Sequence, residues 1–183
     1  MVPNSIKLLF DYARKSIRAG LEGKEYKPRN VPLSLKKKKG VFVTLTINGR
    51  LRGCMGVIIP EEIWKAVIRT AAMSAFEDPR FPPLTKEEFG KVEIEISLLS
   101  QPKKSSRKEI RKGDGVIIRK GAKGALFLPQ VWEELPDKES FLRHLFMKAG
   151  IYDEKGVDYE VFHVKAWKLS GGVIKPVNPQ KDD

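Results

Sequence analysis

Apolar residues near the start of the chain recur every three or four positions, at Ile6, Leu9, Phe10, Ala13, Ile17 and Leu21. This period predicts an amphipathic helix that buries one face against a core. The residues that follow, 22–39, are polar, contain two prolines and end in the lysine run Lys36–Lys39. Because proline interrupts regular structure, we interpret this segment as a linker.

A β-hairpin is the strongest short-range prediction. Residues 41–47 alternate between aliphatic side chains and others, and Asn48-Gly49 follows directly. An Asn-Gly pair adopts the positive φ angles of a type I′ turn, so residues 50–56 are expected to return as the second strand. With a two-residue loop, Leu45 would pair with Arg52 and Val43 with Cys54.

Further helices are predicted by apolar periodicity and by capping residues. We expect a helix at about 61–76, a short capped helix after Thr85, and a helix from Asp137 to Gly150. Residues 78–83 contain three prolines, which exclude a helix and predict a rigid extended loop.

Strand patterns occur at 92–98, 116–118 and 125–128, and a last strand is expected from Tyr159 to Leu169. Helices and hairpins interleave without a repeated βαβ unit. We therefore predict an α+β fold, with a largely antiparallel or mixed sheet and flanking helices. The length predicts one domain, or one domain with two lobes, over residues 1–183, including a polar tail at about 176–183.

The composition excludes several classes of protein. Hydrophobic residues make up 41% of the chain, enough for a sizeable core, so a disordered chain is not expected. No apolar run approaches the ~18–20 residues of a membrane span, and Asp11 and Arg14 interrupt any signal-peptide core. A single cysteine, Cys54, excludes an intramolecular disulfide scaffold. We expect a soluble cytoplasmic protein without a membrane partner.

The formal net charge of +12 raises the question of a nucleic-acid partner. Basic residues concentrate at Lys36–Lys39 and between Lys103 and Lys123. Neither cluster is interleaved with aromatic residues, and no recognition motif accompanies them, which weakens the case for RNA binding. A high charge with few Asn, Gln and Cys residues is typical of a thermophile's surface, and it favours charges that serve solubility.

The hexapeptide Leu51–Gly56, with the sequence Leu-Arg-Gly-Cys-Met-Gly, breaks the rules of an ordinary strand. Its two glycines weaken a strand, so we expect a bulge or a close backbone approach there. The simple register would also place Arg52 on an aliphatic face, where an unpaired arginine is costly. Either a bulge near Gly53 re-aims the side chains or Arg52 reaches toward a cleft. Such local conflicts are where functional sites are expected.

Cys54 is the candidate reactive group. Arg52 and exposed backbone N–H groups at the glycines would stabilise its thiolate and lower its pKa. A lone cysteine is also commonly a small buried hydrophobe, so both interpretations stay open. His144, expected to be structural or at the surface, and His163, expected in the core, are candidate bases for Cys54 if the fold brings either close.

Metal and cofactor sites are not predicted. The two histidines lie 19 residues apart and there is no second cysteine, so no metal-ligand spacing occurs. The phosphate-binding Walker loop, the dinucleotide fingerprint and the Gly-x-Ser-x-Gly elbow are all missing from the sequence. We therefore expect no metal and no cofactor.

Three blocks, in the same order, resemble the AMMECR family, named for a human chromosomal region linked to Alport syndrome and midface hypoplasia. They are Leu51–Gly56, Ala75–Leu84 (Ala-Phe-Glu-Asp-Pro-Arg-Phe-Pro-Pro-Leu) and Gly124–Val131 (Gly-Ala-Leu-Phe-Leu-Pro-Gln-Val). The resemblance runs from about residue 5 to 170. Met55 stands where the family usually has isoleucine, a substitution that conserves side-chain volume.

This resemblance implies a compact two-lobed α+β fold, found in archaea, bacteria and eukaryotes. It also implies that the hexapeptide and the Asp-Pro-Arg-Phe-Pro-Pro block form the functional region. The candidate catalytic residues are Cys54 and Arg52, and the candidate binding residues are Gly53, Gly56, Asp78, Arg80 and Gln130. Some family members occur beside, or fused to, Memo-like and radical-SAM proteins, which implies a shared enzymatic pathway.

Two functions from different classes remain open. In the first, the chain is a Cys54-dependent enzyme acting on a small molecule or an RNA base in a cleft between the lobes, lined by the hexapeptide. Cys54 would be the nucleophile or redox group, Arg52 an anion anchor, and Asp78 or Arg80 a polar partner. In the second, it is a non-catalytic module whose basic surface contacts RNA or a partner protein. The exposure and reactivity of Cys54 distinguish the two.

Overall fold

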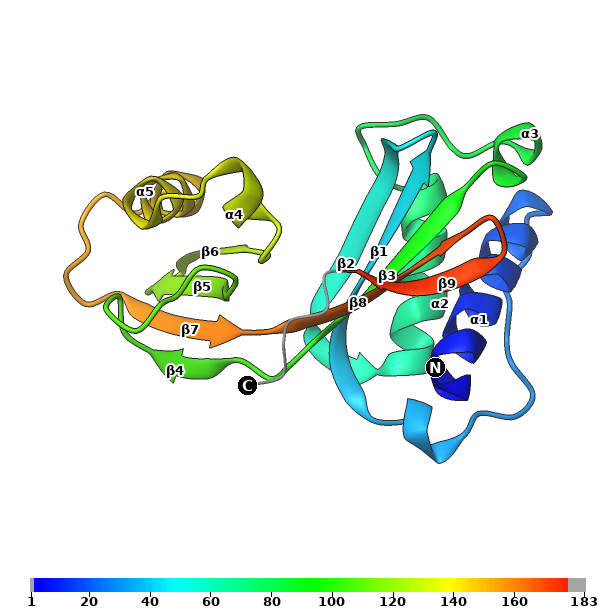
Figure 1. Cartoon of the computed structure of the whole chain (residues 1–183), viewed down its shortest axis with the longest axis horizontal. Coiled ribbons are helices and arrows are strands. Elements are labelled where there is room, and N and C mark those ends of the chain that lie inside the picture. Colours follow the sequence, from blue (N-terminus) through cyan, green and yellow to red (C-terminus); the bar gives the residue numbers. More distant parts are fainter. Residues whose placement is uncertain (1, 178–183) are drawn as a thin grey trace. The chain divides into compact units, whose positions relative to one another are not determined.

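The chain folds into two units, each with its own helices and its own antiparallel sheet (Figure 1). The structure is a computed structural model that describes residues 2–177. Unit 1 comprises residues 1–99 and 165–183, and unit 2 comprises residues 100–164. Helices combined with antiparallel sheets confirm the predicted α+β fold class.

A five-stranded sheet with the order β2-β1-β3-β8-β9 forms the base of unit 1. Its strands are β1 (Lys38–Ile47), β2 (Arg50–Glu62), β3 (Glu93–Leu99), β8 (Val164–Ser170) and β9 (Val173–Val177). Strand β1 pairs antiparallel with both β2 and β3. Asn48 (φ 52°) and Gly49 (φ 72°) join β1 to β2 with positive φ angles, which confirms the predicted hairpin turn.

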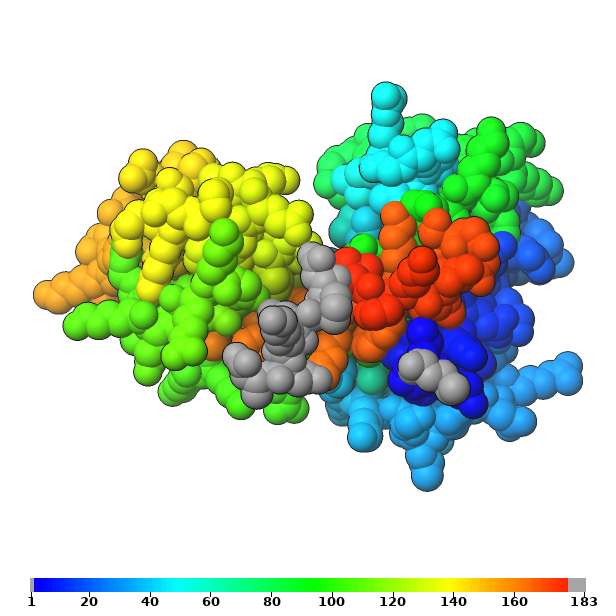
Figure 2. Space-filling model, in the orientation of Figure 1, coloured from blue at the N-terminus to red at the C-terminus, as the bar shows by residue number. Residues whose placement is uncertain are grey.

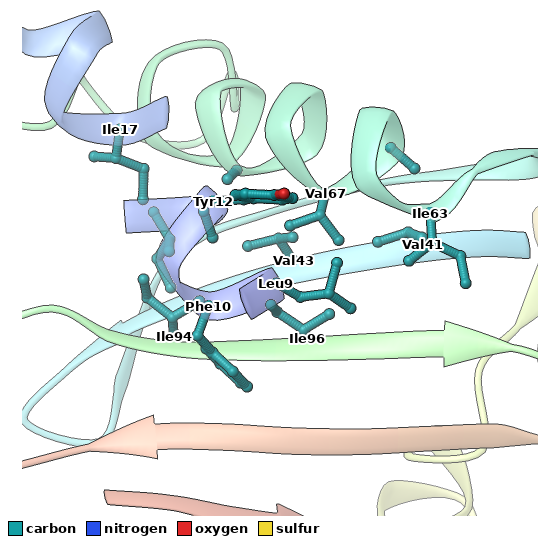
Figure 3. Packing of buried hydrophobic residues seen from close by; sticks show 14 of the residues in the cluster. Leu9, Phe10, Tyr12, Ile17, Val41, Val43, Ile63, Val67, Ile94 and Ile96 are labelled. Carbon is teal, nitrogen blue, oxygen red and sulfur yellow. The ribbon is translucent and has the colours of Figure 1, made fainter. Parts of the chain in front are cut away.

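Helices α1 (Asn4–Leu21) and α2 (Ile63–Phe76) supply the rest of the unit 1 core, and the short η1 (Leu33–Leu35) and α3 (Lys86–Phe89) complete the unit. The predicted apolar face of α1 is buried, including Leu9 and Ile17. Figure 3 shows α1 and α2 packing their apolar side chains, such as Leu9 and Val67, against Val43 and Ile96 of the strands. The core of unit 1 therefore lies between the two helices and one face of the sheet.

Unit 2 has a four-stranded sheet with the order β4-β7-β5-β6. Its elements are β4 (Lys103–Ser105), β5 (Gly115–Lys120), β6 (Lys123–Phe127), α4 (Val131–Glu134), α5 (Lys138–Ala149) and β7 (Asp158–Phe162). As predicted, Asp137 caps α5 by accepting the Ser140 N–H (2.8 Å), and Gly150 ends the helix in the left-handed region at φ 65°. Phe141 and Leu145 of α5 lie in the core of this unit.

The predicted last strand, Tyr159–Leu169, is wrong as a single element. Strand β7 belongs to the sheet of unit 2 and β8 to the sheet of unit 1, with His163 between them. The alternation of side chains passes through this junction without a turn residue, so periodicity does not reveal the change of sheet. Of the predicted polar tail at 176–183, Pro176 and Val177 belong to β9, and the remainder lies outside the described residues.

The segment between α1 and β1 is only partly a linker, since it contains η1 and its last two lysines already belong to β1. Within residues 2–177, none of the helices combines the length and apolar character that crossing a bilayer requires.

Candidate functional site

A β-bulge in the hairpin positions the hexapeptide. Leu45 pairs with Gly53 and Thr46 pairs with Leu51, which leaves Arg52 as the extra residue between two pairs. The bulge predicted near Gly53 is therefore confirmed. It removes the conflict seen in the sequence, because Arg52 no longer has to point into the aliphatic face of the sheet.

The same bulge changes the neighbour of Cys54. Its cross-strand partner is Thr44, whereas the unbroken register predicted Val43. Thr44 pairs in turn with Glu95 on β3. Residues directly opposite each other in antiparallel strands share one face of the sheet, so Cys54, Thr44 and Glu95 form a row across three strands.

Gly53 lies where α2 comes closest to β2. A Cβ atom at this position would be 1.9 Å from the Ser74 carbonyl oxygen, which confirms the predicted close backbone approach. The Ser74 hydroxyl accepts the Met55 N–H at 2.9 Å and lies 2.7 Å from the Val43 carbonyl oxygen. Neighbouring residues of a strand point to opposite faces, so the Cys54 thiol lies on the face of the sheet away from α2.

Asp78 holds the backbone of Cys54. The buried Asp78 carboxylate accepts the Cys54 N–H at 2.8 Å, and it also accepts Arg80 Nη2 at 2.7 Å and Nε at 3.0 Å. Arg80 Nη2 reaches the Cys54 carbonyl oxygen at 3.3 Å. The Arg80 guanidinium holds the pKa of Asp78 well below its usual range, despite burial. Asp78 therefore stays ionised, and with Arg80 it fixes both polar backbone atoms of Cys54.

Arg52 is buried and pairs with a carboxylate of α3, the short helix that follows the proline-rich loop. Its Nε and Nη2 donate to the two oxygens of Glu88 at 2.8 and 2.9 Å, and Nη2 also donates to the Pro82 carbonyl at 2.9 Å. Arg52 lowers the pKa of Glu88 to about 2. The guanidinium thus ties both α3, through Glu88, and the proline-rich loop, through Pro82, to β2, and the expected role of Arg52 as an anion anchor stays a prediction.

The Phe81 ring lies close to both guanidinium groups. The Cζ atoms of Arg52 and Arg80 are 5.8 and 5.7 Å from its centroid, within the range of cation–π attraction. The proline-rich loop is held further by the Leu84 N–H, which donates to the Ala75 carbonyl at 2.8 Å. Residues 78–83 are non-helical, as predicted, but they are not extended throughout, since the Phe81 N–H donates to the Asp78 carbonyl at 3.1 Å in a turn. This loop delivers Asp78, Arg80 and Phe81 to the bulge.

The Cys54 thiol is half-buried, and the Thr44 hydroxyl donates to its sulfur at 3.2 Å. Burial raises the pKa of the thiol, and this outweighs the lowering effects of Thr44 and Arg80. The expected thiolate stabilisation is therefore wrong. The N–H groups of Cys54 and Met55 do not supply it either, because Asp78 and Ser74 accept them.

Both histidines are part of unit 2, whereas Cys54 is part of unit 1. His144 is exposed on α5, as expected, with Nδ1 2.8 Å from the Ser140 carbonyl. His163 is exposed instead of lying in the core, and its Nδ1 is 3.8 Å from Asp114. Among residues 2–177, His, Cys, Asp and Glu side chains form no group of three that could hold a metal ion.

The two remaining candidates occupy different surroundings. Gly56 lies against the Phe42 ring, where a Cβ atom would be 2.2 Å from a ring carbon, so the glycine makes room for this side chain. Gln130 is exposed at the start of α4 in unit 2.

Sequence reasoning did not single out Thr44, Ser74 and Glu95 as members of the site. Thr44 and Glu95 follow from the hairpin once one extra residue is placed at Arg52, and that bulge was one of two alternatives considered. Ser74 had no such signal, since a serine on an amphipathic helix resembles any other small residue. Only the close approach of α2 to β2 brings its hydroxyl to the Met55 N–H.

Comparison with known sequences places this arrangement in a family. The AMMECR1 family matches residues 10–167 of the chain. A protein of Nanoarchaeum equitans is 41% identical over 151 residues, covering 76% of this chain and 84% of its own. A protein of Pyrococcus furiosus is 34% identical over 204 residues, covering 97% of this chain and 96% of its own.

A solved structure gives the same result for the fold. The crystal structure of the uncharacterized protein PH0010 from Pyrococcus horikoshii superposes with a TM-score of 0.83 at 35% sequence identity, covering 93% of this chain and 95% of that protein. The family match includes the hexapeptide and the proline-rich loop, since both lie within residues 10–167. The chain belongs to the AMMECR1 family.

Proposed function

We propose that the chain acts on a small polar molecule bound against Cys54, on the face of the unit 1 sheet away from α2, with the Cys54 thiol as the reacting group. The observation that carries the proposal is the contrast between the backbone and the side chain of this residue. Asp78 and Arg80 hold its N–H and carbonyl groups, while the thiol itself stays half-exposed. A rigid backbone under an accessible functional group is what preorganised sites require.

The thiol is protonated in the resting site. Because burial raises its pKa, Cys54 is uncharged near neutral pH and must lose its proton before it attacks as a nucleophile. Glu95 lies in the same row, one strand beyond Thr44, and its negative charge contributes to the raised pKa. A ligand that brings positive charge, or that accepts the proton itself, would therefore switch the thiol on only when bound.

Arg80 supplies the second polar group of the proposed site. Its side chain is 54% exposed although it is anchored to the buried Asp78. Donors of the guanidinium that point to solvent are suited to a carboxylate or phosphate of the ligand. We therefore favour a ligand whose anionic group contacts the Arg80 guanidinium while a different atom of the ligand meets the Cys54 thiol.

The alternative, a module whose basic surface binds RNA or a protein, has less support. Several cations of the 103–123 stretch pair with carboxylates of unit 2: Arg107 with Glu139 and Glu154, Arg119 with Glu160, and Lys120 with Asp153. Such pairs use charge that a phosphate backbone would otherwise neutralise. The alternative therefore depends on the exposed cations that remain, which include Lys36–Lys38 and, in the 103–123 stretch, Lys103, Lys104, Lys108, Arg111 and Lys112.

Alkylation protection tests the proposal directly. Native protein is treated with iodoacetamide after incubation with fractions of a small-molecule extract, and modification of Cys54 is followed by intact mass. At least one fraction should slow labelling of the wild type, and Arg80→Gln should weaken that protection. Labelling that no fraction slows, or a native thiol that resists the reagent until the protein is unfolded, would contradict the proposal.

The alternative is measured separately by fluorescence anisotropy with single-stranded RNA at several salt concentrations. Binding that uses six phosphate contacts falls on the order of a thousandfold between 50 and 200 mM salt. Submicromolar binding that survives physiological salt and disappears when Lys36–Lys39 are changed to Ala would favour the basic surface over the Cys54 site.

A further inference from the structure

Unit 1 contains a concave site that shares no residue with the Cys54 cluster. A pocket of about 610 Å³ lies between α1 and the segment 26–36, lined by Tyr26, Arg29, Asn30 and Lys36 among others. Figure 1 shows this segment running back along α1 before it reaches η1, and Figure 2 shows the two in adjacent shades of blue at the surface of the unit. The volume falls within the range typical of pockets for small ligands.

An aromatic ring is held in place at this pocket. Tyr26 is half-buried, and its ring centroid lies 6.0 Å from that of Tyr12, with the ring planes tilted by 49°. Tyr12 is itself buried and donates its hydroxyl to the Asn30 carbonyl at 3.1 Å. Lys15 covers part of the Tyr26 ring, with Nζ 5.9 Å from the centroid. The Tyr26 ring is thus a supported platform rather than a free side chain.

The lining of the pocket is positively charged. It contains three cations, Lys15, Arg29 and Lys36, against a single carboxylate, Asp11. Asp11 is already engaged by Lys15 at 2.7 Å. Arg29 and Lys36 are exposed, and within residues 2–177 no hydrogen bond or ion pair occupies the Arg29 guanidinium. Two cations therefore remain available to an anion beside the Tyr26 ring.

The segment that carries these groups is stiffened by its own sequence. Pro28 and Pro32 both line the pocket, and proline fixes φ, so the backbone between them has fewer conformations to lose on binding. The Tyr12 hydroxyl further ties this segment to α1. A pocket formed in this way exists before the ligand arrives.

We propose that this pocket binds a small organic anion that carries a planar ring, of the nucleoside phosphate class. The ring stacks on Tyr26, since every nucleobase offers a π face to an aromatic platform. The phosphate is held by Arg29, whose planar guanidinium matches two phosphate oxygens, and by Lys36 as a point charge. The exposed Asn30 amide lies at the same rim and can contact the edge of the ring.

Calorimetric titration of the full chain with ADP, adenosine and inorganic phosphate tests this site. ADP should bind at least tenfold more tightly than either fragment, because it alone uses both the ring and the cations. Arg29→Ala should weaken ADP binding about tenfold through the lost charge-assisted hydrogen bonds. Tyr26→Ala should weaken it by a similar factor, while Tyr26→Phe, which keeps the ring, should bind as the wild type.

A matched control removes the same charge elsewhere. Arg111 is exposed in unit 2, and Arg111→Ala should leave ADP affinity unchanged. Thermal melts of each variant show that the fold is kept. ADP should also leave the rate of Cys54 alkylation unchanged, which separates this proposal from the one for the Cys54 site.

Several outcomes would overturn the proposal. These are no ADP binding at millimolar concentration, inorganic phosphate binding as tightly as ADP, and equal effects of Arg29→Ala and Arg111→Ala. A short single-stranded RNA that binds more tightly than ADP and depends on Arg29 would assign the pocket to a nucleic acid instead. Protection of Cys54 from alkylation by ADP would indicate that ADP binds at the Cys54 site and not in this pocket.

Discussion

Two arginine–carboxylate pairs lie at the bulge of β2, and they differ in which member is buried. In the Arg52–Glu88 pair the arginine is buried, with its side chain 10% exposed against 32% for the glutamate. In the Arg80–Asp78 pair the carboxylate is buried, at 2% against 54% for the arginine. Both pairs join the segment after α2 to the hexapeptide, through α3 for Glu88 and through the loop for Asp78, but only the Arg80–Asp78 pair contacts the backbone of Cys54.

The difference shows what each pair does for the site. The buried member of a pair needs its hydrogen bonds most, because water does not replace them. Arg52 donates to Glu88 of α3 and to the Pro82 carbonyl of the loop, and so ties both segments to β2. Asp78 uses its acceptors to fix Cys54 and lets the exposed Arg80 complete the pair. The first pair holds the fold together, and the second shapes the candidate site.

The largest effect is expected from Asp78→Ala, which should lower the free energy of unfolding by about 3 kcal/mol, as for other broken buried ion pairs. It removes every acceptor of the pair and leaves the Cys54 N–H without its partner. Asp78→Asn keeps an acceptor for that N–H and should lose about half as much. Urea denaturation measures both. Equal losses would mean that the charge, and not the backbone hydrogen bond, matters at this position.

Glu88→Gln should come next, with a loss of about 2 kcal/mol at pH 7, because it replaces a charged partner of the buried Arg52 by a neutral one. The loss should depend on pH. Glu88 has its pKa lowered to about 2 in the folded protein, so its contribution is present above the ordinary glutamate value of ~4.3.

This contribution fades as the pH falls from that value toward 2. Urea unfolding of wild type and Glu88→Gln should therefore differ most at neutral pH and converge in acid. Glu77→Gln, at another exposed position of unit 1, is the control. A difference that stays constant from pH 7 to pH 2 would show that Glu88 does not act through its charge.

Arg80→Gln removes the exposed partner of the other pair and should cost about 1 kcal/mol, less than Glu88→Gln. Asp78 keeps two backbone donors, the N–H groups of Cys54 and residue 80, which lessen the cost of its buried charge. The charge of Arg80 lowers the pKa of Cys54, so its removal should move the alkylation midpoint of the thiol upward. An unchanged midpoint would show that the charge of Arg80 does not influence the pKa of Cys54.

The smallest effect on stability, below about 1 kcal/mol, is expected from Thr44→Val, which keeps the shape of the side chain and loses one hydroxyl. Its readout is the thiol, since the Thr44 hydroxyl donates to the Cys54 sulfur. The wild-type midpoint for iodoacetamide labelling should lie above ~8.5, the value of a free thiol, and the variant's midpoint should lie higher still. A wild-type midpoint below the free-thiol value would instead support the interpretation in which the site stabilises the Cys54 thiolate.

Local features of the sequence predicted much of the fold. The helical period of α1, the Asn48-Gly49 turn and the caps of α5 are set by residues close together in the chain, so they could be identified without tertiary information. The conflict around Arg52 likewise indicated a bulge near Gly53, and the three blocks resembled the family to which the chain belongs.

Tertiary structure decided the chemistry of the candidate site. Burial, which depends on segments distant in the sequence, raises the pKa of Cys54 although an arginine lies two residues away. The partner of that arginine, Glu88, is 36 residues further along the chain, and its sequence signal was only that of a helix cap. The sequence by itself specified which groups were available near Cys54, whereas the packing of the loop and α2 against β2 decided which of them reached it. Hydrogen bonds and desolvation act over a few ångströms in space, and spacing along the chain does not measure that distance.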